Sequence, residues 1–257
     1  MWRNKAVTSL GFCLGVVLIG CLLQLTAAMK GNTVVFPGVA DIVKAFVRLV
    51  QQKQTWQLVG TTLKHVAVAM AISTFLGVTL GVGMGQSRFV RALLTPMMNL
   101  LRSLPMIVLV VIVMVLDSAD KYARVPVIAS TLVLTPMIAQ AACEGCLRIE
   151  RELIDVYRLN SRLNLKVLRH VHLPLMGGYL AQGWINAAGM GVKLAVSCEY
   201  LVQIKNSLGK AVYQSFSNVM YEETYAYALL MILLVVVLGE LPLAIGRWVT
   251  RLREAKQ

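Results

Sequence analysis

Three ionisable side chains stand inside long apolar stretches of the sequence: Arg102, Lys193 and Glu199. A charge at membrane depth is costly, so such a group usually faces a cavity, a partner charge or a water-filled path. We therefore expect all three to face the interior of a helix bundle and to form a substrate pathway or gate. The alternative is a structural ion pair near the outer membrane surface, with Lys193 extending its ammonium group to the interface. Glu199 would pair with Arg102 or Lys193 if their helices are neighbours.

No sequence pattern for covalent chemistry is present. The chain has no GxSxG nucleophile motif, no HExxH metal motif and no paired carboxylates at a recognisable spacing. Its glycine-containing segments GVGMGQS and NSLGKAV do not match the phosphate-binding pattern GxxxxGK[ST]. The sequence therefore predicts no catalytic residue, no metal, no cofactor and no ATP site of this kind, so any energy source must lie in another subunit.

The cysteines and histidines predict neither a disulfide framework nor a ligand set. The five cysteines are an odd number, and all lie in or at the ends of apolar segments. Cys143 and Cys146 form a CxxC motif without nearby partners at ligand spacing, so a redox or metal role is the minor alternative for them. His65 follows Lys64 at the start of an apolar stretch, which favours a position facing lipid headgroups.

Composition indicates the broad class of protein. Of the 257 residues, 58% are apolar and only 14% are charged, and the mean hydropathy of +0.70 is too high for an ordinary soluble domain. The net charge of +13 does not indicate nucleic-acid binding, because the basic residues flank apolar segments rather than exposed aromatic residues. The sequence predicts an all-α integral membrane protein in which residues 1–257 form one polytopic domain.

Apolar segments of suitable length predict about six transmembrane helices. These spans cover residues 9–29, 58–85, 92–116, 125–142, 174–202 and 225–248. Five spans are the alternative if the first segment is miscounted. Pro96 and Pro105 predict that the third span is broken and lines a cavity. A GxxxG motif at Gly77 and Gly81 predicts close helix packing in the second span.

The segments between the spans predict three further features. Apolar residues on one face of residues 41–50 predict an amphipathic interfacial helix, and a short helix is expected at residues 210–217. The polar stretch 144–174 predicts a loop of two short helices joined by a turn, with several basic residues along one face. The excess of basic residues in this loop and at both termini places all of them in the cytoplasm.

Several motifs, in matching order along the chain, resemble those of one transporter family. The loop ends in Leu173 and Pro174, like a family signature, with Asp155 where glutamate is usual and Ser161 where glycine is usual. The segments LGVTLGVGMGQSRFVRALLTPMMNLLRSLP, SCEYLV and NSLG resemble its glycine-rich helix with an arginine–x–x–proline run, its small–small–glutamate motif and its Gly-Leu-Gly motif. The chain is similar to permease subunits of ATP-binding-cassette (ABC) importers, in the branch that includes nitrate, sulfonate, taurine and thiamine-precursor permeases.

The resemblance implies a specific role for the polar loop. In this family the signature loop forms a coupling helix that docks in a groove of a separate ATPase subunit. Transferred by position, the docking residues are Asp155, Val156, Tyr157, Arg158, Leu159, Ser161 and Pro174. Val156 and Tyr157 replace two residues that are small in the family, so the signature is present in altered form.

The resemblance also implies a non-enzymatic permease of the bacterial inner membrane that works by alternating access. ATP would bind only to the partner ATPase subunits. An extracytoplasmic binding protein would deliver the substrate, and a second permease copy, most simply in a homodimer, would complete the pathway within membrane lipid; nucleic acid has no role. The implied substrate is a small anion such as nitrate, sulfonate or taurine, or a thiamine-precursor-like compound.

Two other functions are open on the sequence alone. One is a membrane-embedded enzyme that uses Glu199, Lys193 or the histidines. The other is a non-transporting sensor or assembly subunit, which the altered signature loop suggests.

Overall fold

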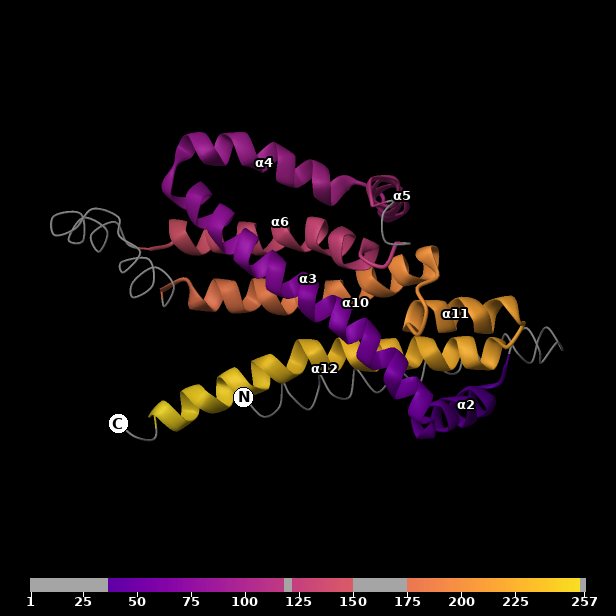
Figure 1. Cartoon of the computed structure of the whole chain (residues 1–257). Coiled ribbons are helices and arrows are strands. Elements are labelled where there is room, and N and C mark those ends of the chain that lie inside the picture. Colours follow the sequence, from indigo (N-terminus) through magenta and orange to yellow (C-terminus); the bar gives the residue numbers. More distant parts are fainter. Residues whose placement is uncertain (1–36, 118–121, 150–174, 255–257) are drawn as a thin grey trace.

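The computed structural model describes residues 37–117, 122–149 and 175–254, with side chains described as far as Leu238. These residues are entirely helical, as the sequence predicts (Figure 1). In chain order the helices are α2 (Val39–Gln51), α3 (Lys53–Gln86), α4 (Arg88–Ser103), α5 (Met106–Leu116), α6 (Val125–Leu147), α10 (Gly177–Val202), α11 (Leu208–Ser217) and α12 (Tyr221–Glu254). The predicted first span and the predicted docking residues, from Asp155 to Pro174, lie outside the described residues.

Three of the described helices, α3, α6 and α12, are long and apolar enough to cross a membrane. The bent pair α4 and α5 passes the same test as one unit, which raises the number to four. Helix α10 occupies the predicted fifth span and has 26 residues. It is long enough to cross a membrane but is not among the helices that are apolar enough, because polar residues interrupt it, such as Gln182, Asn186, Lys193 and Glu199.

The predicted break in the third span is confirmed. Helix α4 ends at Ser103, α5 begins at Met106, and the two axes are bent by 102°. Leu104 between them is extended (φ −65°, ψ 130°), the conformation that a following proline favours. Pro96 lies inside α4 without ending it.

Two helix ends differ from the prediction. Helix α6 continues to Leu147, so Glu144 belongs to the helix and not to the loop. Helix α3 begins at Lys53, five residues before the predicted start of the span at residue 58. Both differences have one cause: polar residues on one face suggested the end of an apolar segment, whereas the opposite face remains buried, as Thr55 does in α3.

The two predicted short helices are present. Helix α2 buries Ile42, Ala45 and Leu49 on one face and packs against α12. Helix α11 begins after Ser207, whose Oγ accepts a hydrogen bond from the backbone N–H of Lys210 at 3.3 Å, a normal N-cap contact.

The GxxxG motif packs closely, as predicted. Helices α3 and α6 run in the same direction, with Gly77 against Ile138 and Gly85 against Cys146. Between these two contacts, a Cβ atom added at Gly81 would overlap a backbone oxygen of α6. Glycine is therefore required for this helix crossing rather than merely tolerated in it.

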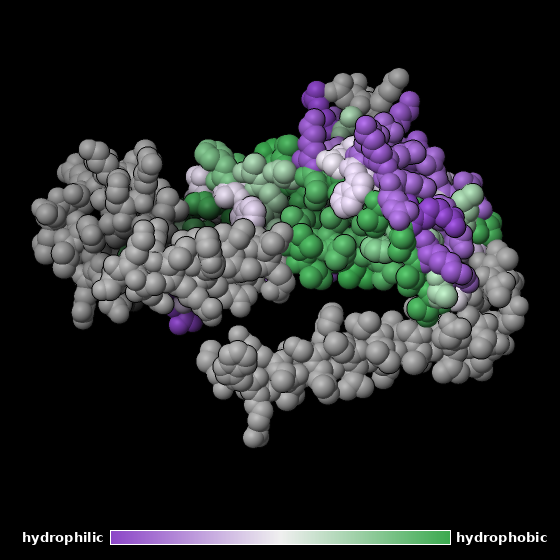
Figure 2. Space-filling model, turned by 90° about the horizontal axis from the view of Figure 1, so that it is seen from below, coloured by the Kyte–Doolittle hydropathy of each residue, from purple (hydrophilic) through white to green (hydrophobic). Residues whose placement is uncertain are grey.

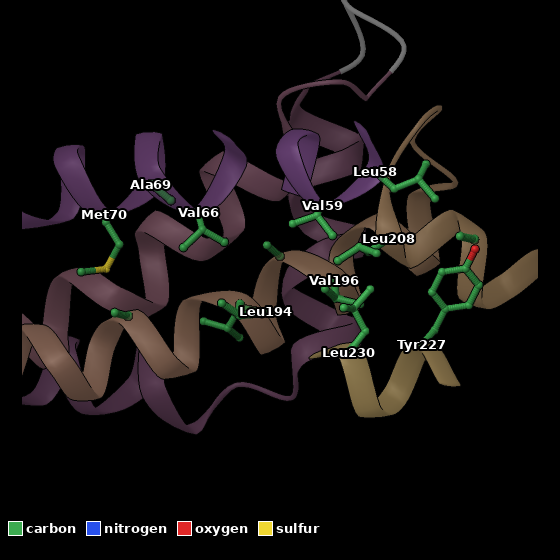
Figure 3. Packing of buried hydrophobic residues seen from close by; sticks show 14 of the residues in the cluster. Leu58, Val59, Val66, Ala69, Met70, Leu194, Val196, Leu208, Tyr227 and Leu230 are labelled. Carbon is green, nitrogen blue, oxygen red and sulfur yellow. The ribbon is translucent and has the colours of Figure 1, made fainter. Parts of the chain in front are cut away.

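Helix α10 runs antiparallel to α6 and packs beside it. Met176, just before α10, lies against Gly145, and further along Gly183 lies against Ala141. The largest cluster of buried apolar residues joins α2, α3, α6, α10, α11 and α12. Figure 3 shows part of it, with Val66 of α3 and Leu194 of α10 on facing helices.

The bundle has two distinct ends (Figure 1). At one end α3 and α6 terminate and α10 begins, and we call it the loop end because residues 150–174 connect α6 to α10 there. At the other end lie α2 and α11, and we call it the α11 end. Figure 2 shows hydrophilic surface gathered toward the end that carries α2, next to a broad hydrophobic surface. This distribution matches a bundle whose middle lies in a membrane.

Candidate functional site

A groove with a cavity volume of about 220 Å³ lies between α4, α6 and α10. We call it the polar groove; its lining residues are Arg102, Met137, Gln140, Ala141, Glu144, Tyr179, Gln182, Gly183 and Asn186. Six of these residues have polar side chains, and no other described residue buries them: Arg102, Gln140, Glu144, Tyr179, Gln182 and Asn186. The bundle therefore presents polar groups on a side that its own described helices do not cover.

Hydrogen bonds link the side chains of this groove into two sets. Arg102 donates through Nη1 to Gln140 Oε1, and Gln140 Nε2 donates to Glu144 Oε1 at 3.1 Å. On the opposite wall, Gln182 Nε2 donates to Asn186 Oδ1 at 3.2 Å. The groove thus contains one guanidinium, one carboxylate and several amide groups.

Helical periodicity explains how these residues share one face. On α6, Gln140 and Glu144 are four residues apart, and on α10, Gln182 and Asn186 are also four apart, so each pair lies along one stripe of its helix. The two stripes meet because Gly183 allows α10 to approach α6 closely. Sequence reasoning missed these four residues, although their i, i+4 spacing within apolar helices was a usable signal.

A second feature is a fully buried carboxylate near the α11 end. Glu199 of α10 has 0% exposure. Its Oε2 accepts hydrogen bonds from Thr62 Oγ1 at 2.8 Å and from the backbone N–H of Gly209 at 3.2 Å, and its Oε1 lies 2.7 Å from His65 Nδ1. These contacts compensate for burying a charge. Glu199 therefore joins α3, α10 and α11 at one point.

The local sequence permits this arrangement in two ways. A Cβ atom added at Gly209 would overlap the backbone of α10 and lie 2.5 Å from Glu199 Cβ, so only glycine lets α11 come this close. Thr62 donates to Glu199 and also accepts a hydrogen bond from the backbone N–H of Leu208 at 3.1 Å. The first turn of α11 is therefore held by side chains of two other helices.

The structure separates the four residues predicted for a pathway or gate. Arg102 lies in the polar groove, and Pro105 lies at the bend between α4 and α5. Lys193 is exposed on α10, and no hydrogen bond or ion pair to it is found among the described residues. Glu199 contacts neither Arg102 nor Lys193, because His65 and Thr62 occupy its two oxygens.

His65 differs from the prediction that it faces lipid headgroups. Its side chain is only 16% exposed, and its Nδ1 contacts Glu199. The contact between His65 and Glu199 could not be predicted from the sequence, because the two residues are 134 positions apart along the chain.

Within the described helices no group of three or more His, Cys, Asp and Glu side chains is placed to hold a metal ion. Cys143 and Cys146 are buried free thiols, and Cys146 lies against Gly85 in the α3–α6 crossing. The structure thus gives the CxxC motif a packing role.

A larger cleft, of about 560 Å³, opens at the α11 end. It is bounded by the start of α3, the segment before α11, α11 itself and the start of α12. Lys205, Lys210 and Glu223 are its charged residues. No ion pair of these three is found among the described residues.

Residues 73–254 match the family described as the inner membrane component of binding-protein-dependent transport systems. The chain belongs to this family. A probable ABC transporter permease of Brucella melitensis is 24% identical to this permease over 214 residues, which cover 82% of the permease and 85% of the relative. The bicarbonate transport system permease CmpB of Synechococcus elongatus is 26% identical over 198 residues, covering 77% of the permease and 68% of the relative.

Solved transporter structures share the fold of the permease. The MetNI methionine ABC transporter, in an inward-facing conformation, superposes with a TM-score of 0.66 at 21% identity, covering 77% of the permease and 99% of the solved chain. A bacterial ABC transporter involved in the import of alginate gives a TM-score of 0.67 at 13% identity, covering 97% and 99%. At these identities the likeness establishes the architecture.

The family membership excludes one of the two other functions that the sequence left open. The chain is an ABC importer permease, a multi-pass component of the bacterial inner membrane, and the resemblance drawn from its motifs is confirmed. The alternative of a membrane-embedded enzyme is wrong, because the family consists of transport permeases.

Proposed function

We propose that two copies of this permease form the translocation pathway of an ATP-driven importer for a small solute, and that the polar groove lines this pathway. The observation that carries the proposal is the set of six exposed polar side chains gathered in one groove between apolar helices. Lipid offers such groups no hydrogen bonds. A water-filled path between two permease copies offers them.

In this proposal the ATPase subunits dock on the loop between α6 and α10. The docking residues are those that the family signature indicates: Asp155, Val156, Tyr157, Arg158, Leu159, Ser161 and Pro174. The described ends of the loop support this role, since Met176 lies against Gly145 and both loop ends therefore leave the bundle at one point. The two helices that flank the docking residues are therefore in contact where they reach the loop.

The binding protein docks, in this proposal, at the α11 end. That end carries the 560 Å³ cleft, whose three charged residues, Lys205, Lys210 and Glu223, form no ion pair among the described residues and could pair with a partner. The loop end then faces the cytoplasm together with both termini, as the distribution of basic residues predicts. The solute enters at the α11 end and leaves at the loop end.

The pathway residues differ in their roles. Arg102 contacts the solute from the groove, and Pro105 maintains the bend that brings the end of α4 to the groove. Glu199 is a positioning residue that holds α11 against α3 and α10, because all of its contacts are made inside the bundle. Lys193, exposed on α10, faces the second copy or the aqueous path.

Alternating access requires a coupling energy between nucleotide and permease. To change the ratio of two conformations from 1:99 to 99:1, ATP must favour one of them by about 5.5 kcal/mol. The pair of ATPase subunits supplies this difference in free energy when it closes on nucleotide. Its closure moves the loop between α6 and α10, here called the coupling loop, in each of the two permease copies.

The substrate belongs, in this proposal, to the small solutes of the related branch: nitrate, a sulfonate, taurine or a thiamine-precursor-like compound. The name of the cyanobacterial relative adds bicarbonate to this group.

Purification of the tagged permease from its native membrane tests the proposal. We expect an ATPase subunit and a binding protein to co-purify, and we expect ATP hydrolysis only when the ATPase subunit is present. Mass spectrometry of the solute retained by the binding protein then identifies the substrate, and uptake of that solute should disappear when the permease gene is deleted. Unchanged uptake after deletion would instead support the sensor or assembly subunit.

A further inference from the structure

The polar groove holds a cation and an anion that do not touch each other. The amide of Gln140 stands between them, since it accepts from Arg102 and donates to Glu144 at 3.1 Å. Within the described part of the chain, neither charged side chain forms an ion pair of 4.0 Å or less. Two opposite charges thus share one groove without forming a salt bridge.

Both charges keep most of their bonding capacity. A guanidinium has five N–H donors, and the described residues use one of those of Arg102. The carboxylate of Glu144 accepts one hydrogen bond from the described residues, through Oε1. A direct pair between guanidinium and carboxylate would be stronger than either contact with a neutral amide. The arrangement therefore leaves a donor site and an acceptor site open at the two ends of the Gln140 amide.

We propose that the polar groove selects a small zwitterion, whose acidic group binds Arg102 and whose ammonium group binds Glu144. The inference rests on the proposed function, because it assigns a substrate class to the groove of that pathway. A simple anion would be attracted by Arg102 and repelled by Glu144. A simple cation would be attracted by Glu144 and repelled by Arg102. Only a solute that carries both charges satisfies both side chains at once.

The remaining walls of the groove suit such a solute. Gln182 and Asn186 on α10 add neutral hydrogen-bonding groups, which orient a ligand without changing the charge balance. An amino acid or an aminosulfonate therefore matches the groove in charge and in hydrogen-bonding groups.

Ligand-induced stabilisation of the purified permease–ATPase complex tests this inference. The probes are three zwitterions (taurine, β-alanine and glycine), the anion ethanesulfonate and the cation ethylammonium, compared at constant ionic strength. We expect at least one zwitterion to raise the melting temperature with increasing concentration, with an apparent affinity about tenfold or more above that of either singly charged probe.

Variants of the two charged residues separate their contributions. Arg102→Gln and Glu144→Gln should each weaken binding of the stabilising zwitterion about tenfold, and Glu144→Gln should also remove the preference for it over ethanesulfonate. Arg88→Gln on the exposed start of α4 and Glu222→Gln in the first turn of α12 make the same chemical changes outside the groove. These control variants should leave the affinity unchanged.

Three results would overturn the inference. Equal stabilisation by ethanesulfonate, with no effect of Glu144→Gln, would make the groove a simple anion site. No stabilisation by any of the three zwitterions would exclude this substrate class. A complex that transports normally while its binding protein retains a solute without a positive charge would reject the zwitterion and leave the proposed importer function standing. Loss of the proposed function itself would appear separately, as absence of the ATPase subunit from the purified complex.

Discussion

The carboxylate of Glu199 is fully buried, and its contacts reach two side chains of α3 and the backbone of α11. A charge in such a place is stable only while every partner remains, because an unpaired buried group keeps its full desolvation penalty. This residue therefore contributes directly to holding α11 against α3 and α10.

Glu199→Gln tests this dependence. The amide keeps the size of the side chain, and its oxygen can still accept from Thr62 and from the backbone N–H of Gly209. Because a neutral amide oxygen accepts hydrogen bonds more weakly than a carboxylate does, these contacts lose strength. We expect the variant to lose about 1–3 kcal/mol of unfolding free energy, measured as a lower melting temperature of the purified permease. Glu222→Gln, an exchange at the start of α12, should not change it. An unchanged melting temperature for Glu199→Gln would show that the buried contacts do not stabilise the bundle.

Sequence reasoning singled out two charged residues with defined polar surroundings but not their neighbours. Arg102 and Glu199 stood out because charges in apolar segments are costly, and both occupy defined polar environments. Their partners could not be predicted, since Thr62 is 137 residues from Glu199 and one sequence does not show which helices are neighbours. Glu144 was assigned to a loop because its polarity was taken as the end of a span, whereas it faces the groove from within α6.

At the scale of the helices, the crossing of α3 and α6 depends on glycine. Gly77, Gly81 and Gly85 lie at intervals of four along the face of α3 that meets α6. Side chains at these positions would push the two backbones apart. The close approach of the two helices therefore depends on the missing side chains at these three positions.

The variant Gly81→Ala tests whether the α3–α6 crossing requires glycine, and Gly60→Ala is its matched control. Both are glycine-to-alanine changes in α3, but a Cβ atom at Gly81 would overlap the backbone of Ala139, whereas a Cβ atom at Gly60 would meet nothing within 4 Å. We expect Gly81→Ala to lose about 1–3 kcal/mol through overpacking, and Gly60→Ala to be neutral or to gain up to about 1 kcal/mol through helix propensity. Thermal unfolding measures both. Equal melting temperatures for the two variants would contradict the packing argument.

Helix existence was easier to predict than helix limits. The short helices α2 and α11 and the break at Pro105 were predicted correctly, since amphipathic periodicity and proline act locally. The limits of α3 and α6 were missed because they depend on which face is buried, and this is decided by tertiary contacts. Helix α10 shows the same effect, since residues that lower its hydropathy include the polar stripe of the groove.

At the scale of the whole molecule, the coupling loop is the proposed attachment point of the ATPase. Asp155→Arg combined with Tyr157→Asp reverses the charge of one docking residue and makes another polar. We expect this double variant to remain inserted in the membrane but to lose the ATPase subunit on co-purification. Lys44→Glu on α2, at the opposite end of the bundle, also reverses a charge and should retain the subunit. Normal ATPase binding by the double variant would show that the subunit docks elsewhere.

The proposed orientation makes a separate prediction about the C-terminus. A fluorescent protein that folds only in the cytoplasm, fused after Gln257, should be bright, whereas alkaline phosphatase at the same position should be inactive. The two reporters inserted in the segment 204–207 before α11 should give the opposite result. An active phosphatase at the C-terminus would reverse the direction assigned to the bundle.

The positions of the tight contacts along α3 have a mechanical consequence. Near one end Gly85 is pressed against α6, and near the other Thr62 and His65 are tied to α10 through Glu199. Because both contacts are close, we expect a displacement of α6 near its end to shift α3 with it. Helix α3 would carry that shift toward Thr55, which lines the cleft thirty residues before Gly85.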